Sequence, residues 1–139
     1  MSSQLRTELA ETVHAAAIRI LRIVRVEDTK AGIGPAQLSA LSVLVFAGPH
    51  TIGELAVLEQ VKPPTMSRIV DALVSQKLAD RVTSEEDRRS VRIATTAKGR
   101  KLLLAGRDRR VRVLAERMEK FSESELKLLS QAARLLAQI

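Results

Sequence analysis

Thr65, Ser67 and Arg68 follow two prolines, Pro63 and Pro64, at the start of one predicted helix. Because proline fixes a φ angle that suits a first helical turn, these three side chains should stand on that turn. Together they offer two hydroxyls and a guanidinium, which can donate hydrogen bonds to base edges and phosphates. A helix inserted in the major groove of DNA reads bases from its N-terminal residues. Two plainer roles stay open: helix capping by the hydroxyls and an internal ion pair for the guanidinium.

The positive charge of the chain is concentrated in residues 81–112. This segment holds eleven Lys and Arg against four Asp and Glu. Residues 1–80 hold eight against eight, and residues 113–139 hold four against four. The formal net charge of +7 therefore comes from one segment. Such a distribution is typical of a surface that binds a polyanion.

Residues 81–99 are expected to form a charged β-hairpin whose tip carries Asp87, Arg88 and Arg89. Asp87 lies two residues before Arg89, so we predict that its carboxylate orients the Arg89 guanidinium for the minor groove. Arg88 is expected to contact DNA from the same tip. Phosphate contacts are predicted for three nearby cations, Lys62, Arg92 and Lys98. The alternative is a solvated charged turn without any DNA contact.

The rest of the composition narrows the class of partner. Only Phe46 and Phe121 are aromatic, so unpaired bases have few rings to stack on, and duplex DNA is favoured over RNA or single strands. The absence of cysteine excludes disulfides and thiolate zinc sites, and two histidines alone predict no metal site. Neither a signal-peptide pattern nor an apolar run of membrane length is present. We expect a cytoplasmic protein with no membrane contact and no cofactor.

Hydrophobic periodicity and helix-capping residues predict a mainly α-helical chain with one small β-hairpin. Thr51 with Glu54 and Ser122 with Glu125 have the spacing of capping boxes, and Thr96 can cap the helix after the hairpin. The predicted helices cover residues 4–26, 35–46, 52–59, 63–77, 97–119 and a terminal segment from 123. Two short strands are expected around Val82 and Val91–Ile93. Two short helices across a tight turn at 60–62, followed by a hairpin, predict a winged helix-turn-helix.

The C-terminal helix is apolar on more than one face. Its apolar residues are Leu126, Leu128, Leu129, Ala133, Leu135, Leu136 and Ile139. A domain of this size cannot easily cover such a helix by itself, whereas a second copy of the same elements can. We therefore predict a homodimer, with burial of both faces inside one subunit as the alternative.

Residues 35–100 resemble the DNA-binding core of the multiple-antibiotic-resistance regulator (MarR) family of bacterial transcription factors. The motifs that carry the resemblance are Gln37, Glu54-Leu55-Ala56, residues 64–73, Asp87-Arg88-Arg89 and Thr96-Ala97-Lys98-Gly99. The resemblance implies a winged helix-turn-helix with flanking N- and C-terminal dimerisation helices. It implies a homodimer that binds a pseudo-palindrome, usually to repress a nearby promoter. It also implies recognition-helix contacts by Pro64, Thr65, Ser67 and Arg68, and a minor-groove contact by Arg89 that Asp87 orients.

Within this framework we expect a single domain over residues 1–139. Its DNA-binding core would cover residues 35–99, and its dimerisation helices residues 1–34 and 100–139. Two residues depart from the family pattern. Gln60 occupies a turn position that is often glycine, and Thr95 stands where a leucine usually precedes the threonine of the wing motif. The missing cysteine excludes the thiol-sensing branch of the family.

Family members often bind small anionic or phenolic ligands between the dimer helices and the winged helix. His14 and Arg19 on the first predicted helix are the candidate ligand contacts, although a solvated charged helix face is the plainer explanation of them. No phosphate-binding loop, dinucleotide-binding motif or nucleophile elbow is present, so we expect no enzymatic activity. The sequence predicts a DNA-binding transcriptional regulator, as a repressor, that acts on double-stranded DNA. The alternative is a nonspecific architectural DNA-binding protein without ligand response.

Overall fold

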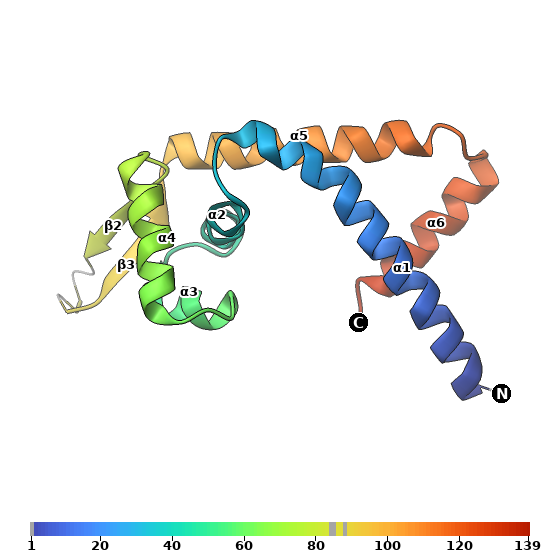
Figure 1. Cartoon of the computed structure of the whole chain (residues 1–139), viewed down its shortest axis with the longest axis horizontal. Coiled ribbons are helices and arrows are strands. Elements are labelled where there is room, and N and C mark those ends of the chain that lie inside the picture. The colour runs from blue at the N-terminus through green and yellow to red at the C-terminus, as the bar shows by residue number, and fades with distance from the viewer. Residues whose placement is uncertain (1, 84–85, 88) are drawn as a thin grey trace. The chain divides into compact units, whose positions relative to one another are not determined.

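The computed structural model of the chain describes residues 2–83, 86, 87 and 89–139. Its elements in order are α1 (Ser2–Asp28), η1 (Thr29–Ala31), α2 (Pro35–Ala47), β1 (His50–Thr51), α3 (Ile52–Leu58), α4 (Pro63–Ser75), β2 (Ala79–Thr83), β3 (Val91–Thr95), α5 (Ala97–Met118) and α6 (Glu123–Leu136) (Figure 1). The chain divides into two compact units, one of residues 26–108 and one formed by the segments before 26 and after 108. The chain is mainly α-helical with one β-hairpin, which confirms the predicted fold class of a winged helix-turn-helix.

The unit of residues 26–108 contains a small antiparallel sheet in the order β1-β3-β2. The predicted hairpin is present as β2 and β3, and its register pairs Ala79 with Thr95 and Arg81 with Ile93. Strand β1 was not predicted from the sequence. It is two residues long and pairs His50 with Ile93, so β3 has a partner on each side.

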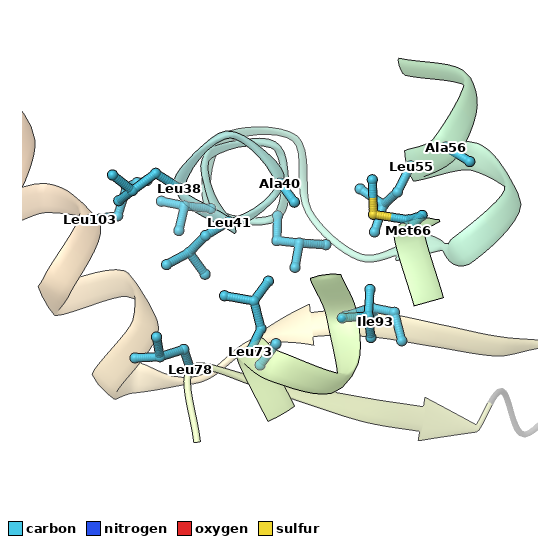
Figure 2. Close-up of a cluster of buried hydrophobic side chains, with 14 residues drawn as sticks. Leu38, Ala40, Leu41, Leu55, Ala56, Met66, Leu73, Leu78, Ile93 and Leu103 are labelled. Carbon is cyan, nitrogen blue, oxygen red and sulfur yellow. The ribbon is translucent and has the colours of Figure 1, made fainter. Parts of the chain in front are cut away.

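An aliphatic core joins these strands to the helices of the same unit. Its fully buried large side chains are Leu41, Leu44, Leu55, Met66, Val70, Leu73, Leu78, Ile93 and Leu103. Figure 2 shows side chains from α2, α4, the hairpin and the start of α5 directed into one cluster. Ala56 is buried at the end of α3, where its carbonyl accepts a hydrogen bond from the Val61 N–H at 3.0 Å. The small side chain thus belongs to the residue whose carbonyl closes the tight turn between α3 and α4.

Local signals fix the ends of the helices. The Ser122 capping box is complete, since Ser122 Oγ accepts from the Glu125 N–H and Glu125 Oε2 accepts from the Ser122 N–H. At α3 the Thr51 hydroxyl accepts from the Glu54 N–H at 3.1 Å. Gln60 has φ 55°, so this left-handed turn position does accommodate a side chain where the family often has glycine.

The second unit consists of most of α1, the end of α5 and α6. Within the described chain, neither α1 nor α6 contains a buried residue. Large apolar side chains such as Leu5, Leu9, Leu128 and Leu135 are each more than half exposed. As for membrane crossing, no single helix of the described residues has the required length and apolar character. Two consecutive helical segments, Ser2–Ala31 and Pro35–Ala47, reach that length and apolar composition only when they are taken together, and the chain bends between them.

Candidate nucleic-acid interface

Helix α4 has one face in the core and one face in solvent. Met66, Val70 and Leu73 recur at intervals of four and three residues and are fully buried. Thr65 and Arg68 are exposed, and Ser67 between them is half-buried. The helix is therefore held by its inner face, while its first turn presents donors outwards.

The start of α4 follows from its sequence. Lys62 is the N-cap in an extended conformation, and Pro63 and Pro64 occupy the first helical positions. The Met66 N–H donates to the Lys62 carbonyl at 3.1 Å. Of the described residues, none accepts or donates a side-chain hydrogen bond to Thr65, Ser67 or Arg68. The two plainer roles considered for them, helix capping and an internal ion pair, are thus not observed.

The tip of the hairpin contains a turn that Asp87 shapes. The Asp87 carboxylate accepts a hydrogen bond from the backbone N–H of Arg89 at 3.0 Å, and orientation of the Arg89 guanidinium by Asp87 stays a prediction. The Ser90 N–H donates to the Asp87 carbonyl, also at 3.0 Å, which closes a tight turn. A carboxylate two residues before an N–H forms this bond readily, because the geometry is that of an Asx turn. Asp87 therefore shapes the backbone from which the exposed Arg89 projects; Arg88 lies outside the described residues.

Two predicted phosphate contacts also bind the protein's own backbone. Arg92 Nη1 donates to the Pro49 carbonyl at 3.4 Å, which ties β3 to the segment before β1. Lys98 Nζ donates to the Gln76 carbonyl at 3.1 Å, at the C-terminal end of α4. Both side chains are exposed, and an ammonium or guanidinium has further donors for a phosphate. Lys62 is exposed and has no side-chain partner among the described residues.

The C-terminal end of α4 is fastened to the start of α5. Lys77 adopts a left-handed conformation, with φ 60°. The Thr96 hydroxyl donates to the Lys77 carbonyl at 2.6 Å and accepts from the Gly99 N–H at 3.0 Å. Thr96 therefore caps α5 as predicted. Thr95, the departure from the family pattern, donates to the Leu78 carbonyl at 3.4 Å, so its hydroxyl is satisfied beneath the strand.

One ion pair in this region was missed by the sequence analysis. Arg81 of β2 donates to the carboxylate of Asp71 on α4. The only signal in the sequence is a pair of opposite charges on a predicted helix and on the strand after it, and spacing alone does not show that they meet. The pair connects the hairpin to the helix that carries Thr65, Ser67 and Arg68.

The two candidate ligand contacts, His14 and Arg19, belong to α1 and precede α4 and the hairpin in the sequence. His14, with Arg6, lines a hollow of about 400 Å³ whose walls are mainly the apolar Leu9, Val13, Leu136 and Ile139 of α1 and the C-terminal segment. Arg19 is exposed on α1 and is not among the residues that line the hollow. Among the described residues, no three His, Asp or Glu side chains form a group that could hold a metal ion.

Known proteins resemble this chain over nearly its whole length. A family model described as the MarR family matches residues 31–90. An uncharacterised helix-turn-helix transcriptional regulator of Mycobacterium bovis, Mb0904, is 34% identical over 128 residues, which are 92% of this chain and 90% of the relative.

The likeness extends to a named repressor and to a solved structure. The transcriptional repressor MdtR of Bacillus subtilis is 30% identical over 113 residues, which are 79% of this chain and 69% of MdtR. The structure of a MarR family protein from Bacillus stearothermophilus aligns with a TM-score of 0.86 and 29% identity. That alignment covers 99% of this chain and 96% of the other. All of these proteins are described as regulators or as members of one regulator family.

Proposed function

Since this chain belongs to the MarR family of helix-turn-helix transcriptional regulators, which are not enzymes, we propose that it is a repressor that binds a pseudo-palindromic operator as a homodimer. The proposed protein is one MarR-like domain in which residues 35–99 bind double-stranded DNA. Residues 1–34 and 100–139 join two subunits. Because its target is chromosomal DNA of a bacterium, its site of action is the cytoplasm.

The observation that carries the proposal is the outward face of α4. Thr65, Ser67 and Arg68 are free of partners in the described chain, while Met66 and Val70 hold the helix rigidly in the core. Pre-organised donors on the first turn of a helix are suited to base edges in the major groove. A protein that bound DNA only through its charge would not need donors at these positions. Sequence-specific binding is therefore favoured over the architectural alternative.

The wing supplies the second contact in this proposal. The turn closed by Asp87 projects Arg89 towards the minor groove, and Arg88 contacts DNA beside it. Lys62, Arg92 and Lys98 bind phosphates around both grooves, which makes the affinity strongly dependent on salt. Pro64 lies at the helix start and approaches the backbone of the DNA. The two half-site centres are expected about one helical turn, roughly 10 bp, apart.

Dimerisation and effector binding belong to the other unit. The exposed apolar side chains of α1 and α6 need a cover that a single chain does not provide, which supports pairing of two copies. A small anionic or phenolic ligand at His14 or Arg19 would change the affinity for DNA. The named repressor among the relatives supports repression as the outcome.

The experiment that tests this function is selection of bound fragments from the genome of the parent organism. The proposal predicts a recurrent pseudo-palindromic site, and a reporter gene placed behind that site should be repressed by the protein. A fragment pool without any common site would contradict sequence-specific binding. Increased reporter transcription would instead identify an activator.

Replacing Arg89 by alanine should weaken operator binding by about 2 kcal/mol, because a minor-groove contact and its charge are both lost. A fluorescence titration at fixed salt measures this. The matched control is Arg100→Ala, which removes the same charge from an exposed side chain on α5. Equal losses of operator affinity in the two variants would show that Arg89 contributes only to the general electrostatic attraction for DNA.

Replacing Arg68 by alanine should relax base preference at one position of each half-site, by about 1–3 kcal/mol. Binding to operators with single base changes measures the preference at each position. Lys62→Ala is the comparison, since loss of a phosphate contact lowers the affinity for all sequences alike. If Arg68→Ala also weakened every sequence equally, Arg68 would be a phosphate contact as well.

A further inference from the structure

The recognition helix α4 carries an acidic side chain, Asp71, that no base or phosphate contact requires. It lies about one turn beyond Ser67, on the exposed part of the helix. An unpaired carboxylate at this place would repel the phosphates of bound DNA. In the structure the Asp71 carboxylate accepts a hydrogen bond from the guanidinium of Arg81 on β2, so its negative charge is neutralised by an ion pair with the wing.

The hairpin has different supports on its two strands. Strand β3 pairs with β1, and Arg92 adds a hydrogen bond to the Pro49 carbonyl. Strand β2 is the outer strand of the hairpin, at an edge of the sheet, and pairs with β3 only. Within the described chain, the Asp71–Arg81 pair is the one side-chain hydrogen bond or ion pair that joins β2 or β3 to α4. It therefore braces the outer strand against the helix.

The exposure of the pair indicates what it does. The side chains of Asp71 and Arg81 remain 64% and 43% exposed, and ion pairs with this much solvent contribute little to stability. We infer that Asp71 and Arg81 are positioning residues that fix the wing relative to α4, and so determine how well both grooves are contacted at once. The inference rests on the proposed function, because it needs α4 and the wing to bind one stretch of DNA.

Replacing Asp71 by alanine separates positioning from charge, because removal of a charge changes both DNA affinities alike, whereas loss of positioning changes their ratio. Removal of a negative charge should raise the affinity for nonspecific DNA. Loss of positioning should lower the ratio of operator affinity to nonspecific affinity by roughly tenfold, a coupling typical of residues in contact. The measurement is a pair of titrations at equal salt, on the selected operator fragment and on a scrambled fragment, with the unfolding midpoint expected to change little.

Asp80→Ala is the matched control. Asp80 is the neighbour of Arg81 on β2, is exposed, and has no ion-pair partner among the described residues. Its replacement removes the same charge, so it should raise both affinities and leave their ratio unchanged. An equal fall in the ratio for both variants would overturn the inference.

The exchanged variant Asp71→Arg with Arg81→Asp tests the pair itself. It keeps the net charge, and an ion pair can form again in the opposite sense. Recovery of the affinity ratio supports positioning, whereas an unchanged ratio in Asp71→Ala, or no recovery in the exchanged variant, overturns it. If the unaltered protein prefers no fragment at all, the proposed function fails first, and that result is distinct from either of these.

Discussion

Replacing Gly99 by alanine is expected to lower the free energy of unfolding by at least about 3 kcal/mol. A Cβ on Gly99 would overlap the carbonyl oxygen of Leu78 and would lie 2.8 Å from Thr95 Oγ1. The Leu78 carbonyl cannot move away easily, since it accepts from the Thr96 N–H at 3.1 Å and from Thr95. Glycine is thus required here because α5 begins in contact with the backbone that leaves α4.

Urea unfolding followed by circular dichroism measures this loss. Gly53→Ala provides the control, because a Cβ there meets only Thr51 Oγ1, at 3.9 Å. Gly53 is the second residue of α3, where alanine should raise the free energy of unfolding by at most roughly 0.5–1 kcal/mol. A Gly99→Ala protein as stable as the unaltered chain would contradict the close approach of α5 to Leu78.

Replacing Leu128 and Leu135 together by glutamate is expected to give a monomer whose operator affinity is reduced at least about a hundredfold. The two side chains are 65% and 68% exposed and lie seven residues apart, on one side of α6. In the proposed dimer they pack against the second subunit, and two carboxylates there would have to lose their hydration without a counter-charge. A single subunit then holds one half-site only.

Analytical ultracentrifugation reports the assembly state, and a titration with operator DNA reports the affinity. The control variant is Ser130→Glu with Gln138→Glu, which adds the same two charges, one at a polar position of α6 and one just beyond its C-terminal end. It should remain dimeric and bind almost normally. A dimeric Leu128→Glu, Leu135→Glu protein would place the subunit contact elsewhere.

The helices could be predicted from the sequence because their signals are local. Two prolines start α4, Ser122 and Glu125 cap α6, and a spacing of four and three residues identifies the buried face of α4. Strand β1 could not be predicted in this way. His50 and Thr51 form a strand only because Ile93 and Arg92, far along the chain, come to lie beside them.

The candidate interface was predictable in its residue types and less so in its contacts. Charge counting finds the wing, but it does not show that Lys98 binds the Gln76 carbonyl. Spacing brings Asp87 close to Arg89, yet only the folded turn determines that the carboxylate accepts from the backbone N–H. The Asp71–Arg81 pair depends on how β2 returns past α4, which is a property of the tertiary structure.

Competition binding tests the central claim most directly. The labelled operator fragment is bound by the protein at physiological salt, and unlabelled operator or bulk genomic DNA is added as competitor. A sequence-specific regulator should prefer its operator by roughly three orders of magnitude or more. Competition by bulk DNA at nearly the same concentration would contradict the account and favour an architectural protein that binds through charge alone.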